Sequence, residues 1–287
     1  MRKLLRKLLA TVLGPLFALV FLAPASAQWD PPFITKSVVD VAVRPGVTVR
    51  YLAITSILGP PSKAVILFAG GNGLLNITAS GAITTDLQHN FLVRSRFKFA
   101  NQGLYVAIVD TADAMTINGG VRLSKQYAND IAKVITDVRL RSGRDVWLVG
   151  TSSGTLSAAG VAARRPLDDD PRTKVNFSRP DGIVLTSTQA RFVDNFCEKI
   201  VFDAALANIN VPAFTVAHAD DDCVCSPPKG RLLVLTKLTS SPVKESQLFT
   251  GGLPQYSKDA CDAYTPHGFY GIESSVVSAI ANWIKTH

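Results

Sequence analysis

The fold is decided by residues 146–159, which read VWLVGTSSGTLSAA. Four apolar residues of buried-strand character come first, small residues at 150–154 form a turn, and an alanine-rich segment of helical character follows. A G-x-S-x-G sequence between a strand and a helix is the context in which a nucleophile elbow forms. Ser152 would then stand at the tip of a sharp turn with its Oγ open to a substrate, next to free backbone N–H groups at the start of the helix.

The motif requires glycine at two positions for steric reasons. A side chain at Gly150 or Gly154 is expected to collide with the neighbouring strand or with the helix. The alternative interpretation is a helix cap built of small residues, in which Ser152 or Ser153 only caps the helix. The apolar strand before the turn and the helix after it favour the elbow.

Strands and helices alternate along the rest of the chain. Residues 34–43 and 47–57 are expected to pair as an antiparallel hairpin around a Pro-Gly turn. Alternation after an opening hairpin predicts a mostly parallel sheet with helices on both faces. Further strands are expected at residues 64–69, 105–109, 146–149, 183–185 and 213–217, and helices at 86–101, 125–141, 153–164, 192–206, 227–238 and 272–285.

The first 27 residues have the pattern of a cleaved secretory signal, with a basic start, an apolar run at residues 8–22 and an Ala-Ser-Ala site at 25–27. The alternative is a membrane anchor, but the apolar run is short for a span. We therefore expect no stable membrane anchor and a single catalytic domain at residues 28–287. Loss of the signal lowers the formal net charge from +8 to +4, and no basic stripe interleaved with aromatic residues indicates a nucleic-acid partner.

Acyl transfer by a serine needs a base for the Oγ proton, an acid to orient that base, and donors for the developing oxyanion. In a fold with this elbow the acid and the histidine follow the serine in the chain. His267 fits the base, because it lies just before the last expected helix and Gly268 lets its loop bend over the serine. The other histidines are His89, which precedes the serine, His218, which adjoins an acidic run, and the terminal His287.

The acid is expected within Asp220–Asp222. A run of acids is usually a solvated loop, but this one follows the strand at 213–217 and lies between Ser152 and His267, where the acid is required. The oxyanion donors are expected in residues 68–73, which read FAGGNG after an earlier strand. A phosphate-binding loop is the alternative there, but neither a following Lys-Ser/Thr nor a G-x-G-x-x-G pattern is present.

The chain resembles the α/β-hydrolase-fold serine hydrolases, and among them a group of exported bacterial proteins without an assigned substrate. The resemblance covers nearly all of residues 28–287. It is carried by residues 70–73, 150–155, 218–223 and 261–269.

The resemblance implies Ser152 as nucleophile, His267 as base and an acid within the aspartate run. It also implies the backbone N–H groups of Gly71 and Ser153 as oxyanion donors. Asn72 remains an alternative to Gly71, because this glycine loop replaces the His-Gly pair common in the wider fold.

Two counts select the acid. Related folds place the acid about four residues after the strand ends, and the fourth residue after Ala217 is Asp221. Cys223 follows two residues later, and this D-x-C spacing resembles the one found in the exported group. Asp221 is therefore the first choice and Asp222 the second.

Four cysteines in an exported chain are disulfide candidates, and they allow three pairings. Cys223 is expected to pair with Cys261, because these two flank the acid and base loops that must converge on the serine. Cys197 and Cys225 would form the remaining pair. The C-x-C spacing lacks a second cysteine or histidine pair, so no metal site is indicated, and the proposed chemistry needs no cofactor.

The expected helix at 192–206 leaves little space for a cap over the site. An uncapped site suits a bulky or polymeric ester, or a small soluble one. Esterases, thioesterases, lactonases and peptidases all use this machinery, and the sequence does not separate them or indicate an oligomeric state. A catalytically silent periplasmic binding module on the same fold is the alternative of another class. The presence of all three triad residue types in the required order favours a serine hydrolase.

Overall fold

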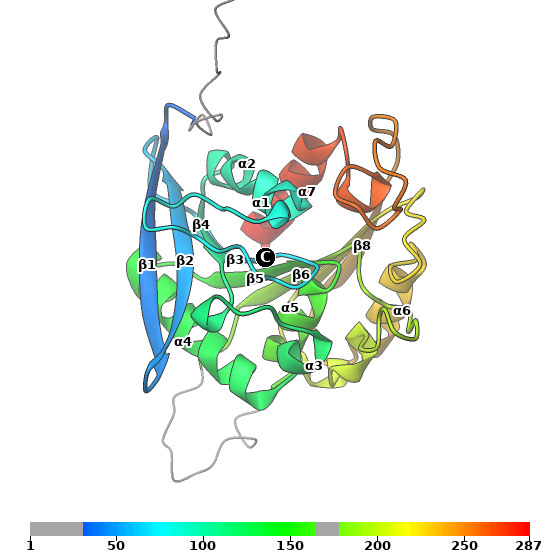
Figure 1. Ribbon diagram of the computed structural model, residues 1–287, viewed down its shortest axis with the longest axis horizontal. Coiled ribbons are helices and arrows are strands. Elements are labelled where there is room, and N and C mark those ends of the chain that lie inside the picture. The colour runs from blue at the N-terminus through cyan, green and yellow to red at the C-terminus, as the bar shows by residue number, and fades with distance from the viewer. Residues whose placement is uncertain (1–30, 165–177) are drawn as a thin grey trace, which may run out of the picture. The chain divides into compact units, whose positions relative to one another are not determined.

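One sheet organises the protein in the computed structural model, which describes residues 31–164 and 178–287. Its eight strands within these residues lie in the order β1-β2-β4-β3-β5-β6-β7-β8 (Figure 1). Strands β1 and β2 form the predicted antiparallel hairpin, β2 pairs antiparallel with β4, and all later pairs are parallel. The strands are β1 (Ile34–Arg44), β2 (Val47–Ser56), β3 (Lys63–Phe68), β4 (Leu104–Val109), β5 (Val146–Thr151), β6 (Gly182–Thr186), β7 (Ala213–His218) and β8 (Lys244–Phe249).

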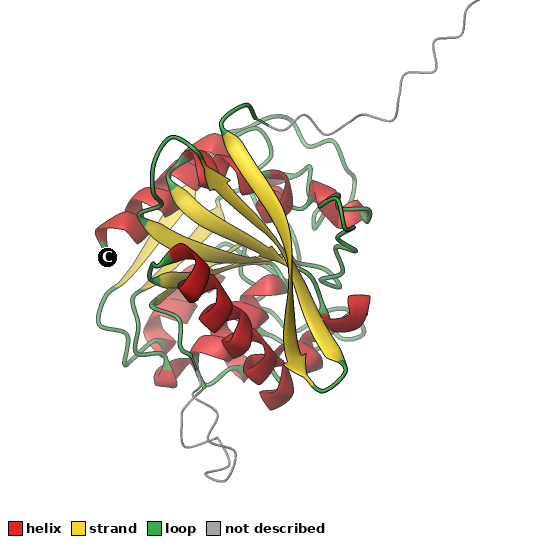
Figure 2. Ribbon diagram, turned by 90° about the vertical axis from the view of Figure 1, so that its left-hand side faces the viewer, coloured by secondary structure: helices red, strands yellow, loops and turns green. Residues whose placement is uncertain are grey.

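Helices cover both faces of this twisted sheet (Figure 2). One face carries α1 (Phe91–Arg94), α2 (Arg96–Asn101) and α7 (Glu273–Thr286). The opposite side carries α3 (Gly119–Arg122), α4 (Lys125–Ser142), α5 (Gly154–Ala162) and α6 (Gly230–Lys237). The sequence therefore predicted the architecture correctly: a mostly parallel sheet between two helical layers that opens with an antiparallel hairpin.

Strand β5 shows why an apolar run becomes a central strand. Side chains alternate between the two faces of a strand, so Val146 and Leu148 enter one core while Trp147 and Val149 enter the other. All four are buried. The Trp147 ring packs edge-on against Trp283 of α7, with ring centroids 5.4 Å apart. This packing holds the last helix against the strand that leads to Ser152.

Two helix predictions were wrong in detail. Residues 86–101 do not form one helix, because Asn90 has non-helical backbone angles and its side chain accepts a hydrogen bond from the Leu92 N–H. This local bond ends the 3-10 turn at Asp86–His89 and starts α1 as a new helix.

The second error concerns residues 192–206. All residues between β6 and β7 are described, and they contain the 3-10 turns Val201–Asp203 and Leu206–Asn208 rather than a longer helix. A β-bridge between Val193 and Cys197 turns the chain back on itself there. The expectation of little or no cap is nevertheless correct, since this connection adds no separate layer.

Residues Pro32–His287 form one compact unit. The predicted signal segment at residues 1–27 lies outside the described residues. Among the residues that are described, no helix is both long enough and apolar enough to cross a membrane.

The steric role of Gly150 gives a first prediction. A methyl group at this position would collide with the backbone carbonyl of Gly154. We expect Gly150→Ala to lower the free energy of unfolding by about 1–3 kcal/mol or more, as overpacking does in cores. Gly59→Ala is the matched control, because Gly59 is exposed and a Cβ there meets no atom within 4 Å. Urea unfolding midpoints compare the two variants, and equal midpoints would contradict the steric argument.

Candidate active site

The turn between β5 and α5 has the geometry of an elbow. Ser152 has a φ of +52°, a left-handed conformation that costs energy for any residue with a side chain. The backbone holds it there. Its N–H donates to the Thr186 carbonyl at 3.1 Å, and its own carbonyl accepts from the Thr155 N–H at 3.0 Å and the Thr155 hydroxyl at 2.6 Å. The half-buried Ser152 side chain is therefore displayed at the carboxyl end of the sheet.

The glycines of the turn meet the steric condition expected of them. A Cβ at Gly154 would collide with the Phe68 carbonyl of the neighbouring strand β3, and a Cβ at Gly150 would collide with the Gly154 backbone. A capped helix start would impose no such limit. Ser153 makes no capping hydrogen bond to the helix, which removes the main support for the alternative interpretation.

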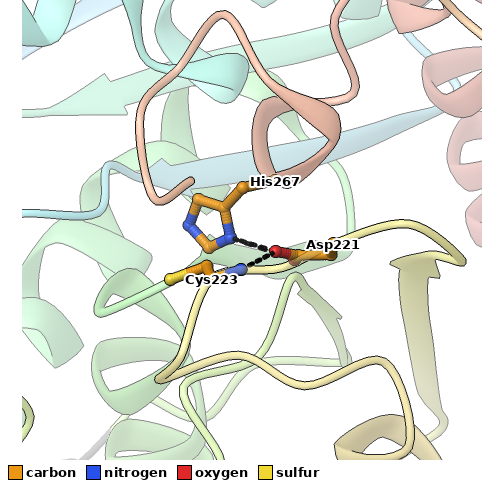
Figure 3. A group of neighbouring side chains, drawn as sticks. All are labelled: Asp221, Cys223 and His267. Atoms are coloured by element: carbon orange, nitrogen blue, oxygen red, sulfur yellow. Dashed lines mark hydrogen bonds and ion pairs between the residues drawn. The ribbon is translucent and has the colours of Figure 1, made fainter. Parts of the chain in front are cut away.

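A buried pair formed by His267 and Asp221 lies across from the elbow. His267 Nδ1 is 3.0 Å from Asp221 Oδ2 and 3.2 Å from Oδ1, and Oδ1 also accepts the Cys223 N–H at 3.0 Å (Figure 3). The side chain of Asp221 is fully buried and that of His267 is 6% exposed. A carboxylate at Nδ1 selects the tautomer with the proton on Nδ1 and leaves Nε2 as the acceptor. The imidazole is thus oriented to take a proton on its other nitrogen.

The loop of His267 is fixed by its own hydrogen bonds. Thr265 caps the 3-10 turn Pro266–Gly268, because its hydroxyl accepts the His267 N–H at 3.2 Å. The Ser187 hydroxyl donates to the His267 carbonyl at 2.7 Å. The ring is therefore held from both the backbone and the side chain.

The neighbouring aspartates and the remaining histidines have other surroundings. Asp220 and Asp222 are exposed. His218 is buried, accepts the Asp220 N–H at Nδ1 and bonds the Gly251 carbonyl through Nε2 at 2.8 Å. Both of its nitrogens are thereby occupied, so His218 shapes the acidic loop. His89 is exposed and lines a cavity beside Ser152, a position that its place in the sequence did not indicate.

The glycine loop after β3 runs next to the elbow. A Cβ at Gly70 would be 3.0 Å from the Ser152 Cβ, so the loop backbone passes directly beside the serine. Gly71 is exposed with a φ of +55°. Within the described residues, the backbone N–H groups of Gly71 and Ser153 donate to no acceptor of the protein. Both groups are therefore available to a ligand at Ser152.

Two cavities meet at this point. One has a volume of about 410 Å³ and is lined by Ser152 and His267 together with His89 and Tyr264. The other has a volume of about 640 Å³ and is lined by Ser152 and Ser153 together with Gln189 and Lys199. Gly71, Ser152 and Cys261 belong to both. Ser152 Oγ and His267 form no hydrogen bond to each other among the described residues, and such bonds are often long in enzymes without substrate.

Two disulfides hold the loops around the cavities. Cys223 is bonded to Cys261 and Cys197 to Cys225, which are the two pairs expected from the sequence. The first joins the loop of Asp221 to the loop of His267. The second ties residues 193–197 to the same acid loop. The two disulfides therefore restrict the movement of the acid loop and of the loop that carries His267.

The same residues bear on metal binding. Potential ligand atoms of Asp221, Cys223 and His267 lie within 4.8 Å of one another. The Cys223 sulfur is part of a disulfide, and Asp221 and His267 are hydrogen-bonded to each other. A metal would need the free thiolate, so this set could bind one only after reduction.

Sequence reasoning did not find two residues that support the site. The Gln189 amide accepts the Ser153 hydroxyl at 2.8 Å and donates to the Lys199 carbonyl at 2.6 Å, which fixes the floor of the larger cavity. The Arg122 guanidinium lies under the glycine loop. Neither stands in a recognisable motif, so only the folded chain reveals their positions.

No protein-family model matches the chain, and no curated protein matches it. Solved structures match its fold. A cold-adapted esterase from an Arctic intertidal metagenomic library is 13% identical, with coverage of 90% of this chain and 97% of that chain and a TM-score of 0.55. A Pyrococcus furiosus esterase is 11% identical, with coverage of 88% and 91% and a TM-score of 0.59. Dienelactone hydrolase from Anabaena variabilis is 12% identical, with coverage of 89% and 99% and a TM-score of 0.53.

These similarities establish the fold. The strand order, the elbow after β5 and the structural relatives together define an α/β-hydrolase fold. The fold predicted from the sequence is confirmed.

Proposed function

We propose that the protein is a serine hydrolase that cleaves an ester-type bond with Ser152 as nucleophile, His267 as base and Asp221 as acid. One observation carries this proposal: His267, hydrogen-bonded to the buried Asp221, lines the same cavity as a serine held at a left-handed elbow. The structural relatives include esterases and a dienelactone hydrolase, which supports the same class of reaction.

The chemistry follows from the positions of these groups. Ser152 Oγ attacks the ester carbonyl while His267 Nε2 takes its proton, and Asp221 stabilises the imidazolium. The N–H groups of Gly71 and Ser153 stabilise the oxyanion of the tetrahedral intermediate. Collapse of the intermediate releases the alcohol, which receives the proton from His267. Water then attacks the acyl-enzyme while His267 takes its proton, and His267 returns that proton to Ser152 Oγ as the acid product leaves.

The two cavities allow the alcohol part and the acyl part of the ester to be assigned to different sides of Ser152. The leaving oxygen must come within reach of His267, so the alcohol part belongs in the cavity of about 410 Å³ that His267 lines. The acyl part then belongs in the cavity of about 640 Å³ on the side of Ser153. Glu198, Lys199 and Asn195 border that second cavity. This polar wall, without a covering cap, suits a bulky polar or polymeric ester better than a long aliphatic acyl chain.

We also propose that the protein is exported and functions in the periplasm or outside the cell. The signal pattern of residues 1–27 and the two disulfides support export, because disulfides persist in oxidising compartments.

Export gives a prediction about the mature chain. Protein recovered from the periplasm should begin at Gln28 and should yield, without reduction, a peptide that links Cys223 to Cys261. N-terminal sequencing and peptide mass mapping measure both properties. A retained Met1 together with free thiols at these two cysteines would contradict the proposal.

The assignment of the nucleophile is tested by two neighbouring serines. We expect Ser152→Ala to lower kcat for p-nitrophenyl acetate on the order of 10⁴- to 10⁶-fold with little change in Tm, because the nucleophile is lost and the fold is not. Ser153→Ala is the matched control, since its N–H is retained and only the hydroxyl bond to Gln189 is removed. Loss of activity in Ser153→Ala but not in Ser152→Ala would move the nucleophile by one residue. Wild-type protein that hydrolyses no ester would favour a binding module.

The acid is tested by three adjacent aspartates. Asp221→Asn should lower kcat on the order of 10⁴-fold, because an amide at this position favours the wrong tautomer of His267. Asp220→Asn and Asp222→Asn should remain close to wild type, because both side chains are exposed. The three kcat values are compared on one substrate. Equal small losses in all three variants would show that the acid lies elsewhere.

A further inference from the structure

The guanidinium of Arg122 lies under the glycine loop, inside the protein. The residue is 1% exposed. Its Nη2 donates to the carbonyls of Ala69 and Gly71, each at 3.1 Å, and reaches the Gly70 carbonyl at 3.5 Å. Its Nη1 donates to the Ser157 hydroxyl at 2.7 Å. One side chain thus contacts three consecutive carbonyls of the loop and one residue of α5.

This buried cation has no carboxylate partner among the described residues, and its Nε makes no hydrogen bond. Burial lowers the pKa of the Arg122 guanidinium. Burying an uncompensated charge costs stability, and an apolar side chain could fill the same space at lower cost. The local chain at Gly73 accommodates the group, because a Cβ there would come within 2.8 Å of Arg122 Nη2. The hydrogen bonds to the glycine loop are therefore what a buried arginine provides at this position and an apolar side chain would not.

The direction of the loop N–H groups follows from peptide geometry. In a planar trans peptide the C=O and the N–H point in opposite directions. The Gly70 carbonyl shares its peptide unit with the Gly71 N–H, and the Gly71 carbonyl shares its unit with the Asn72 N–H. The Gly71 carbonyl accepts from Arg122 Nη2 at 3.1 Å, and the Gly70 carbonyl accepts the Gly73 N–H at 3.2 Å and lies 3.5 Å from Arg122 Nη2, so both carbonyls face Arg122. Both N–H groups are consequently turned away from Arg122.

The second contact connects Arg122 to the elbow. Ser157 lies in α5, which begins at Gly154 directly after the turn of Ser152 and Ser153. The same guanidinium therefore holds both structures that carry the expected oxyanion donors, the glycine loop and the start of α5.

We propose that Arg122 is a positioning residue for the oxyanion hole: its guanidinium sets the orientation of the Gly71 N–H and its distance from the Ser153 N–H. This inference rests on the proposed function of the Ser152 site. It adds a residue that touches neither the substrate nor the triad. It also explains how a loop of glycines, which has little stiffness of its own, can present a donor in one fixed direction.

The test compares Arg122→Met and Arg122→Lys with Arg96→Met. Arg96 is also 1% exposed, lies in α2 on the opposite face of the sheet from Arg122 in α3, and donates to the Val93 carbonyl. Its replacement therefore controls for the loss of a buried arginine. For p-nitrophenyl acetate we expect Arg122→Met to lower kcat about 100-fold, as a small displacement of a catalytic group does, with KM nearly unchanged. Arg122→Lys should fall between this variant and wild type, and Arg96→Met should keep the wild-type kcat.

Amide hydrogen exchange of peptides that span residues 69–74 gives a readout that does not depend on activity. We expect faster exchange there in Arg122→Met and Arg122→Lys than in wild type, and no change in Arg96→Met. A wild-type enzyme that is active while Arg122→Met matches Arg96→Met in kcat would overturn the inference. If the wild type hydrolyses no ester, the proposed function fails, and unchanged exchange in the Arg122 variants would then separately overturn the positioning role. If Arg122→Met does not fold, the test rests on Arg122→Lys. A wild-type kcat together with wild-type exchange in Arg122→Lys would then overturn the positioning role.

Discussion

Three stretches of backbone meet at the turn around Ser152 without room for a side chain between them. Gly150 faces the Gly154 carbonyl, and Gly154 faces the Phe68 carbonyl at the end of β3. The chain reverses here with Ser152 in a left-handed conformation. Such strain persists where the surrounding structure over-determines it. The central strands and α5 supply that surrounding structure, so the serine is placed by the most buried part of the sheet.

The rest of the site is brought to this turn by loops that are distant in sequence. Asp221 follows β7 and His267 precedes α7, and the Cys223–Cys261 disulfide connects the two loops directly. The buried Asp221 carboxylate accepts bonds from the Cys223 N–H and from the imidazole, which offsets its loss of hydration. Arg122 donates hydrogen bonds to the carbonyls of the glycine loop, which passes beside the serine. Rigid support of this kind is what the proposed acyl transfer requires.

The sequence predicted the sheet well because strands of this kind depend on local signals, and it also selected Asp221 and His267, which the structure brings together as a hydrogen-bonded pair. Apolar runs such as the one at residues 146–149 indicate buried strands, and chain order restricts the acid and the base. The helices at 86–101 and 192–206 were mispredicted because a single side-chain bond at Asn90 and a bridge between Val193 and Cys197 decide the path of the chain there. Arg122 and Gln189 could not be predicted, because the hydrogen bonds that tie them to the site span the chain: Arg122 bonds Ser157, 35 residues away, and Gln189 bonds Ser153, 36 residues away.

The central claim is that Ser152 is an activated nucleophile. The most direct measurement is the site of covalent modification by a fluorophosphonate, which reacts with a serine whose hydroxyl is activated by a base. The protein would be treated with the reagent, digested, and mapped by mass spectrometry, with heat-denatured protein as control. The account predicts one adduct, on Ser152, that forms in the folded protein alone. A folded protein that stays unmodified, or that carries the adduct on another residue, would contradict it.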